Sequence, residues 1–337
     1  MQIKNNILCI AFCVIGLKGI AQEPVANTVH LGLFTPVSTQ GKYAKQISPS
    51  FSLQILQGVN FNNKGVAIGG LYHKLYGNNK GVMISGLLNK VSGSDKGVSI
   101  AGLYNAAANG RGLQIAGLHN QKSGNGFVQI AGLSNSSHFE ILQIAGLVNI
   151  NKTVHTQIAG LVNVATSVKG VQIAGLVNIA DSSDHPIGLI NIIKTGEQQI
   201  GVQVYDDASA NIVLRTGGRK TYGIISIGVG NELKKTVFQM EAGMGYHIGL
   251  SEPFRINAEA VAISKTDFTF FKHTQSLRAL LAYKINPAIE VVAGPALNTY
   301  KYADSKIFGD NYLWRKNDSE SSFAITIGAL AGVNINL

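Results

Sequence analysis

The sequence predicts an all-β protein in two parts: a β-solenoid-like repeat array, followed by an antiparallel β-barrel of about eight strands. A motif typified by Val-Gln-Ile-Ala-Gly-Leu-Val-Asn recurs at intervals of about 15 residues. After about residue 196 the motif stops, and longer segments alternate apolar and polar residues, as strands with two different faces do. The chain also has 39 glycines against 7 prolines, which suits turns and closely packed strands.

The N-terminus predicts export. Lys4 is followed by an apolar stretch over 7–17 and by Gly-Ile-Ala-Gln at 19–22, the layout of a signal peptide cleaved near Ala21. The stretch is shorter than the roughly 20 residues of a membrane-spanning helix. Cys9 and Cys13 lie within it, so we expect no disulfide and no catalytic thiol in the mature chain. The predicted divisions are a signal peptide (1–21), N-terminal capping strands (22–63), the repeat array (64–195) and the barrel (196–337).

Nine repeat units can be aligned on one glycine, and successive motif glycines are 13 to 16 residues apart. A motif asparagine follows three residues after the glycine in most units. The motif glycines are Gly70, Gly86, Gly102, Gly117, Gly132, Gly146, Gly160, Gly175 and Gly188. The motif asparagines are Asn89, Asn105, Asn120, Asn135, Asn149, Asn163, Asn178 and Asn191. Short polar links rich in glycine, asparagine and serine separate the units, as expected of turns.

Two architectures fit this repeat. In a β-solenoid each unit forms one coil, with the branched residues stacked inside and the asparagines in a hydrogen-bonded ladder. In the alternative, one large transmembrane β-barrel, each unit is a spanning strand with its Val/Ile/Gly face toward lipid and its Gln/Ala/Asn face inward. The units all run in the same chain direction and hold few aromatic residues, which favours the solenoid.

The C-terminal third has the pattern of an outer-membrane barrel. The clearest strands cover 237–248 and 322–337, with further candidates at 210–216, 220–230, 253–263, 275–285 and 288–299 and a short strand near 312–315. Charges on the less apolar faces are expected to point inward and pair; they are Glu241, Arg255, Glu259, Arg278, Lys284 and Glu290. The links alternate between tight ones (250–252, 286–287) and long ones (264–274, 301–321), as in outer-membrane barrels. The longest link carries the aromatic residues Tyr302, Phe308, Tyr312 and Trp314.

The combination of FTPVSTQG near the N-terminus, the G-V-Q-I-A-G-L-V-N units and the junction IGLINIIKTGEQQIGVQV resembles a largely uncharacterised family of Bacteroidetes-type outer-membrane and surface repeat proteins. The resemblance covers nearly the whole chain. It implies export and an outer-membrane or surface location, and no activity, ligand or catalytic residue. The chain departs from the usual barrel pattern in ending on Leu337 instead of an aromatic residue.

No catalytic, metal-binding or cofactor-binding motif is found, and no nucleic-acid-binding module. We therefore expect a non-enzymatic protein without a cofactor. One charged pattern predicts a ligand: a basic residue lies four positions before the repeat isoleucine at Lys64, Lys80, Lys96, Arg111 and Lys169. In a solenoid the first four would form a stripe suited to an anionic saccharide or lipopolysaccharide.

The function expected from the sequence is that of an outer-membrane or cell-surface protein whose rigid array serves as a scaffold or adhesin-like binding surface. The alternative is a porin-like large barrel that passes small solutes. The sequence does not predict an oligomeric state.

Overall fold

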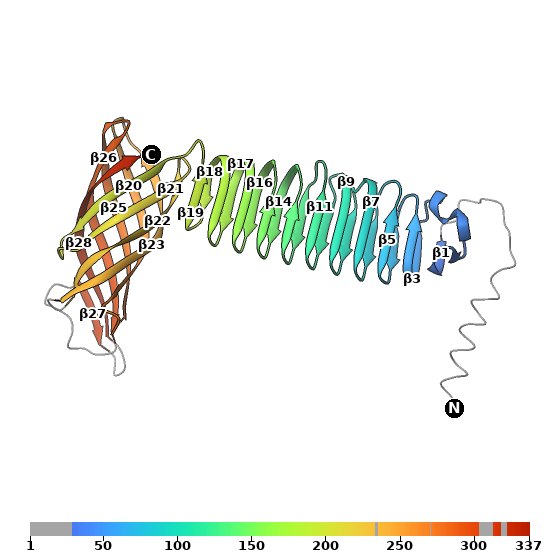
Figure 1. Ribbon diagram of the computed structural model, residues 1–337, viewed down its shortest axis with the longest axis horizontal. Helices are drawn as coiled ribbons and strands as arrows, with labels where there is room; N and C mark the ends of the chain where they lie inside the picture. The colour runs from blue at the N-terminus through green and yellow to red at the C-terminus, as the bar shows by residue number, and fades with distance from the viewer. Residues whose placement is uncertain (1–28, 233–234, 270, 303–312, 318–321) are drawn as a thin grey trace, which may run out of the picture. The chain divides into compact units, whose positions relative to one another are not determined.

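A computed structural model describes residues 29–232, 235–269, 271–302, 313–317 and 322–337. It confirms the predicted fold class, a β-solenoid followed by a closed antiparallel barrel (Figure 1). The chain divides into two compact units, 1–139 and 140–337, which are taken in turn. The predicted signal peptide lies outside the described residues. Within the described residues, no helix is long and apolar enough to cross a membrane.

The first unit is a stack of coils, each made of two short strands joined at the motif glycine. The strands pair in parallel with the equivalent strands of the next coil, so that Val98 lies between Val82 and Leu113. Sheet 1 contains β4 (Val66–Gly69), β6 (Val82–Ser85), β8 (Val98–Ala101), β10 (Leu113–Ala116) and β12 (Val128–Ala131). Sheet 2 contains β5 (Tyr72–Leu75), β7 (Leu88–Ser94), β9 (Tyr104–Asn109), β11 (His119–Lys122) and β13 (Ser134–Ser136).

The stack begins before the first predicted repeat. Strand β3 (Phe51–Asn60) forms a complete coil, because Phe51 pairs with Val66 and Gln57 pairs with Tyr72. Strand β1 (Val29–Phe34) pairs in parallel with β3, and β2 (Val37–Ser38) and the 3₁₀ helix η1 (Gly41–Gln46) follow it. The segment 22–63, expected to be only a cap, thus includes a coil of the solenoid itself.

The orientation of the repeat residues is the reverse of the one predicted for a solenoid. In the units closest to the motif, Gln, Ala and Asn are buried between the two sheets, and Val, Ile and Leu lie on the outside. The inner faces of the two sheets meet where Ala67 and Met83 pack against Leu75, Val91 and Ala107. The prediction that branched residues stack inside is wrong because alternation shows which residues share a face, but not which face is buried.

The second unit continues with coils and then forms the barrel. Its coil strands are β14 (Phe139–Ala145), β15 (Val148–Ile150), β16 (Thr153–Ala159), β17 (Val162–Ala174), β18 (Val177–Ile187) and β19 (Ile190–Ile193). The barrel strands are β20 (Gln198–Tyr205), β21 (Ala210–Gly217), β22 (Thr221–Glu232), β23 (Lys235–Gly249), β24 (Phe254–Thr266), β25 (Phe271–Asn286), β26 (Ile289–Tyr302) and β28 (Ser322–Asn336). Neighbouring strands are antiparallel, and β20 pairs with β28 to close the ring (Figure 1). The alternative of one large barrel is therefore wrong, since the repeats form the solenoid.

Two details of the barrel differ from the predictions. The eighth strand is β20, which the sequence reading missed, whereas the short segment β27 (Trp314–Asn317) is an additional strand beside β28. The link expected over 264–274 is much shorter, because β24 continues to Thr266 and β25 starts at Phe271.

Candidate binding surfaces and the barrel lumen

The motif glycines form a stack in which no side chain fits. A Cβ atom on Gly86, Gly102 or Gly117 would lie 2.0–2.1 Å from the carbonyl oxygen of the glycine one coil earlier. The same contact recurs at Gly132, and at Gly160 and Gly175 in the second unit, at 2.1–2.2 Å. Glycine is therefore required because the backbones of successive coils approach too closely for any other residue.

Gly188 does not belong to this stack. In the last coil Ile187 pairs with Ile173, and Ile190 pairs with Val177, so the bend is one residue shorter than in the coil before. A Cβ atom on Gly188 would meet the side chains of Asn178 and Asn191 instead of a glycine carbonyl. Its alignment with the motif glycines is a correction to the sequence reading, which did not detect this deletion.

The motif asparagines form a buried ladder with two bonds per coil. The amide of Asn105 donates to Oδ1 of Asn120 at 2.9 Å and to the carbonyl oxygen of Ile115 at 2.7 Å. Equivalent pairs of bonds start at Asn89 and Asn120 in the first unit, and at Asn149, Asn163 and Asn178 in the second. A primary amide fits because it can donate two hydrogens while its oxygen accepts one.

A second amide ladder runs with the opposite polarity. Gln129 donates to Oε1 of Gln114 at 2.9 Å, and in the second unit Gln157 donates to Gln143 at 2.9 Å and Gln172 donates to Gln157 at 3.1 Å. A third, short ladder lies at the turns, where Asn63 donates to Asn79 and Asn79 donates to Asp95, each at 2.9 Å. The sequence analysis missed the third ladder, although its members are separated by the same 16 residues as the neighbouring motif glycines.

Several titratable side chains are buried in the interior of the first unit, among them His73 and Asp95. His73 occupies the motif-asparagine position of its coil and accepts a hydrogen bond from the amide of Asn60 at 3.1 Å. Burial and, to a smaller extent, the nearby His30 together lower the pKa of His73 to about 3. Burial raises the pKa of the Asp95 carboxyl, although Ser99 and Asn79 donate hydrogen bonds to it. Neutral His73 is the form that the fold stabilises.

The outside of the solenoid is apolar over a large area. The outer face of sheet 1 in the first unit consists of Val66, Ile68, Val82, Ile84, Val98, Ile100, Leu113, Ile115, Val128 and Ile130. At the bend, the leucine after each motif glycine forms what we call the leucine ridge, with exposed fractions of 39–48%. The ridge of the first unit comprises Leu71, Leu87, Leu103, Leu118 and Leu133. An apolar surface of this extent marks an interaction site on a soluble domain.

The predicted basic stripe lies beside this face. Lys64, Lys80, Lys96 and Arg111 are exposed and each stands two residues before the first strand of its coil, at equivalent positions of four successive coils. The stripe ends at Gly126, and Lys169 stands alone at the same position in the second unit. The predicted anion-binding role of these five residues stays a prediction.

The barrel has an apolar outside and a charged inside. Arg278 forms two hydrogen bonds with the Glu241 carboxylate, at 2.8 and 3.1 Å, and Arg215 is 2.9 Å from Glu259. Arg255 joins Glu197 at 2.6 Å and Glu290 at 2.7 Å. This confirms that the charges predicted for the strands point inward and pair, with Lys284 half-buried beside Glu197. These ion pairs, which we call the lumen network, fill the interior with side chains.

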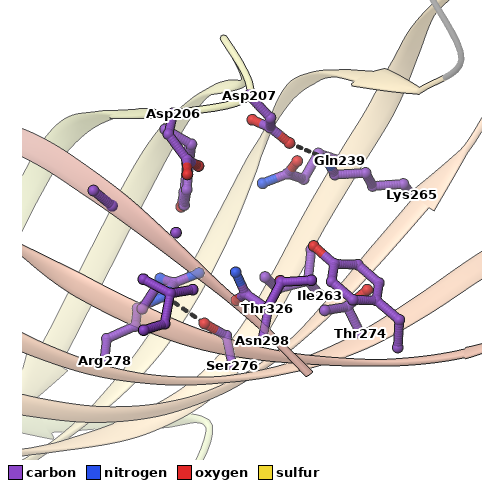
Figure 2. A pocket seen from close by; sticks show the side chains of 16 residues that line it. Asp206, Asp207, Gln239, Ile263, Lys265, Thr274, Ser276, Arg278, Asn298 and Thr326 are labelled. Atoms are coloured by element: carbon purple, nitrogen blue, oxygen red, sulfur yellow. Dashed lines mark hydrogen bonds and ion pairs between the residues drawn. The ribbon is translucent and has the colours of Figure 1, made fainter. Parts of the chain in front are cut away.

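A cavity of about 280 Å³ remains at the end of the barrel near the β20–β21 turn (Figure 2). Its lining includes Asp206, Asp207, Gln239, Lys265 and Arg278 (Figure 2). Lys265 pairs with Asp207 at 2.5 Å, and Arg278 belongs to the lumen network. The cavity is thus a vestibule that ends on buried ion pairs.

The remaining groups are metal-binding side chains and the aromatic residues of the longest link. Among them, no group of three or more His, Cys, Asp or Glu side chains could hold a metal ion. Of the aromatic residues in the longest link, Trp314 is about half exposed and packs edge-on against Phe323, with 6.0 Å between the ring centroids. Phe308 and Tyr312 lie outside the described residues.

No protein-family model and no curated protein matches the chain. Among solved structures, one similar chain is a de novo designed transmembrane β-barrel, with 15% identity, a TM-score of 0.26 and coverage of 42% of this chain and 93% of that chain. Another is Neisserial surface protein A (NspA), with 12% identity, a TM-score of 0.26 and coverage of 42% and 95%. The barrel itself is defined by its strand pairing.

Proposed function

We propose that the chain is a non-enzymatic outer-membrane protein whose barrel anchors the solenoid, and that the solenoid acts as a scaffold or binding surface. One observation carries the proposal: the ring of eight antiparallel strands is closed, apolar outside and filled by the lumen network. A closed barrel is one of two structures that satisfy every backbone group within a bilayer. A lumen filled with paired charges suits an anchor, whereas a porin needs an open channel.

The strand connections support an orientation. The last coil bonds to the barrel at Asn191–Thr216 and Pro186–Thr221, which lie at the end where the connections 218–220, 250–253 and 287–288 are short. The longest connection, between Tyr302 and Ser322, lies at the other end. Because outer-membrane barrels have short periplasmic turns and long outer loops, this favours a solenoid that faces the periplasm over one displayed on the surface.

The anchor role is tested on the full chain expressed with its N-terminal segment. We expect it in the outer-membrane fraction, with a barrel that changes its mobility in SDS gels on heating and gives no stable conductance in planar bilayers. Stable channels would contradict the proposal.

The orientation is tested separately by adding trypsin to intact cells. A periplasmic solenoid is protected until the outer membrane is permeabilised, whereas cleavage in the lysine-containing links of intact cells would mean surface display.

A further inference from the structure

The positive charge of the chain is concentrated in the solenoid of the first unit. Nine Lys and Arg residues lie between 29 and 139, and the single acidic residue there is Asp95, which is buried. Seven of the nine cations are exposed: Lys42, Lys45, Lys64, Lys80, Lys90, Lys96 and Arg111. The formal net charge of the entire chain is only +10. This unit therefore carries nearly all of the excess, and its surface presents cations without a neighbouring carboxylate.

The unit is also amphipathic. Sheet 1 turns only Val, Ile and Leu outward in the five coils from β4 to β12, and the leucine ridge extends this apolar area around the bend. Sheet 2 packs its inner side against sheet 1, so its outer side points away from sheet 1. That outer side is mixed, since Lys74, Lys90, His119, Gln121 and Ser136 alternate there with Tyr72, Leu88, Tyr104 and Ala106, and it is therefore more polar than the outer side of sheet 1. The basic stripe borders the apolar face at the edge opposite the ridge.

We infer that this face of the first unit lies on an anionic lipid bilayer, with the Val/Ile face and the leucine ridge in the acyl boundary and the basic stripe at the lipid phosphates. The arrangement is the β-solenoid counterpart of an interfacial amphipathic helix, which buries an apolar face and places cations at the headgroups. The inference goes beyond the proposed function, which requires no lipid contact outside the barrel.

The charge pattern favours a lipid surface over a second copy of the chain. Two copies meeting through sheet 1 would place each basic stripe either against the other stripe or against the other leucine ridge. Like charges across an interface cost free energy, and an apolar ridge offers no counter-charge to the cations. An anionic leaflet would instead attract each Lys or Arg near its surface, by about 1 kcal/mol per residue. The stripe residues repeat once per coil, at about 4.8 Å, which suits a continuous anionic surface better than a single phosphate group.

The test uses the full chain in nanodiscs of phosphatidylcholine, to which vesicles are added. We expect the protein to float with vesicles of phosphatidylcholine and phosphatidylglycerol (3:1) and not with pure phosphatidylcholine vesicles. Failure of the chain to enter nanodiscs would count against the anchor proposal, whereas normal insertion without vesicle binding would overturn the lipid inference alone. Equal binding to both vesicles would overturn the role of the stripe.

Charge reversal supplies the matched comparison. The variant Lys64→Glu/Lys80→Glu/Lys96→Glu/Arg111→Glu should bind the anionic vesicles at least about a hundred-fold more weakly than the parent, because four attractions become repulsions. Lys169→Glu, an exposed residue at the same repeat position outside the stripe, should bind as the parent does. An unchanged affinity of the fourfold variant would overturn the inference.

A fluorescent probe locates the face that meets the lipid. With Cys9 and Cys13 replaced by serine, Leu103→Cys and Gln121→Cys can each be labelled with an environment-sensitive dye. Brominated acyl chains in the anionic vesicles should quench the dye on Leu103→Cys and leave the dye on Gln121→Cys unaffected. If the Leu103→Cys dye becomes shielded from water without vesicles, and more so as the protein concentration rises, two copies of the chain pair through this face. That result would overturn the inference.

Discussion

The solenoid and the barrel both place polar side chains inside and apolar ones outside, but they satisfy the buried groups differently. In the solenoid, neutral amides bond along the stack to the same residue of the next coil, as Asn105 does to Asn120. In the barrel, charges bond across the lumen, as Arg278 does to Glu241 and Arg215 does to Glu259. A repeated neutral ladder can extend coil by coil, whereas an ion-pair network depends on each member. Single substitutions should therefore affect the two regions to different degrees.

The largest effect is expected in the barrel. Replacing Arg278 by alanine leaves the buried Glu241 carboxylate without its ion-pair partner, which should cost about 3–5 kcal/mol. The single tryptophan, Trp314, lies beside the barrel strand β28, so its fluorescence during urea unfolding reports this region. Lys284→Ala removes a half-buried partner of Glu197 and serves as the control, with an expected change below about 1 kcal/mol. Equal losses in the two variants would contradict the importance of the buried network.

The next effect concerns the glycine stack. In Gly117→Ala the new methyl group meets the Gly102 carbonyl oxygen at 2.0 Å, so neighbouring coils must separate, at a cost of about 3 kcal/mol. Circular dichroism during urea unfolding should show an earlier solenoid transition. Gly249→Ala, at a barrel position with no atom within 4 Å of the new Cβ, should leave both transitions unchanged. A neutral Gly117→Ala would show that the coils are less tightly stacked.

Removing one amide from the ladder should have a moderate effect. Asn120→Ala leaves the carbonyl oxygen of Ile130 and Oδ1 of Asn135 without this donor, at a cost of about 2 kcal/mol. The same unfolding experiment measures it. Asn125→Ala, in an exposed turn, is the control and should change the midpoint little. Identical midpoints for the two variants would mean that the ladder contributes no stability.

The last effect depends on pH and is absent at neutral pH. The pKa of His73 is about 3 in the folded chain and 6.5 in the unfolded chain, so the unfolded state binds the proton first. Stability from neutral His73 is complete above pH 6.5 and is lost as the pH falls toward 3; at pH 5 the loss is about 2 kcal/mol. His73→Asn, which places the ladder residue in this coil, should lose less stability between pH 7 and 5. A parallel decline of parent and variant would remove His73 as the cause.

The sequence was sufficient where periodicity has one structural meaning. The glycine spacing identified the repeat units, and the alternation with charges over 237–290 identified an inward network around Glu241 and Arg278. It was insufficient where two structures share one pattern. Alternation is the same whichever face is inside, so the buried side of the repeat could not be read from it. Strand β20 was missed because it follows the repeats directly and continues their alternation.

The Gly188 misalignment has a similar cause. The segment Ile187-Gly188-Leu189 keeps the Ile, Gly and Leu of the motif but lacks the residue between Ile and Gly, and strand pairing shows that the bend is one residue shorter. The sequence shows the missing residue, but only the pairing with the neighbouring coil shows that Gly188 does not take the place of a motif glycine in the stack. The asparagine Asn191 stays in register with Asn178, so the ladder is preserved across the deletion.

The central claim is that the solenoid buries its amides and exposes its branched residues. The most direct test measures how fast single cysteines react with a water-soluble maleimide. The cysteines are placed one at a time at Val128, Gln129, Ile130 and Ala131, in a chain with Cys9 and Cys13 replaced by serine. The structure predicts fast labelling at Val128→Cys and Ile130→Cys, and slow labelling at Gln129→Cys and Ala131→Cys, because Gln129 and Ala131 are buried. The reverse alternation, with positions 128 and 130 protected, would contradict the account.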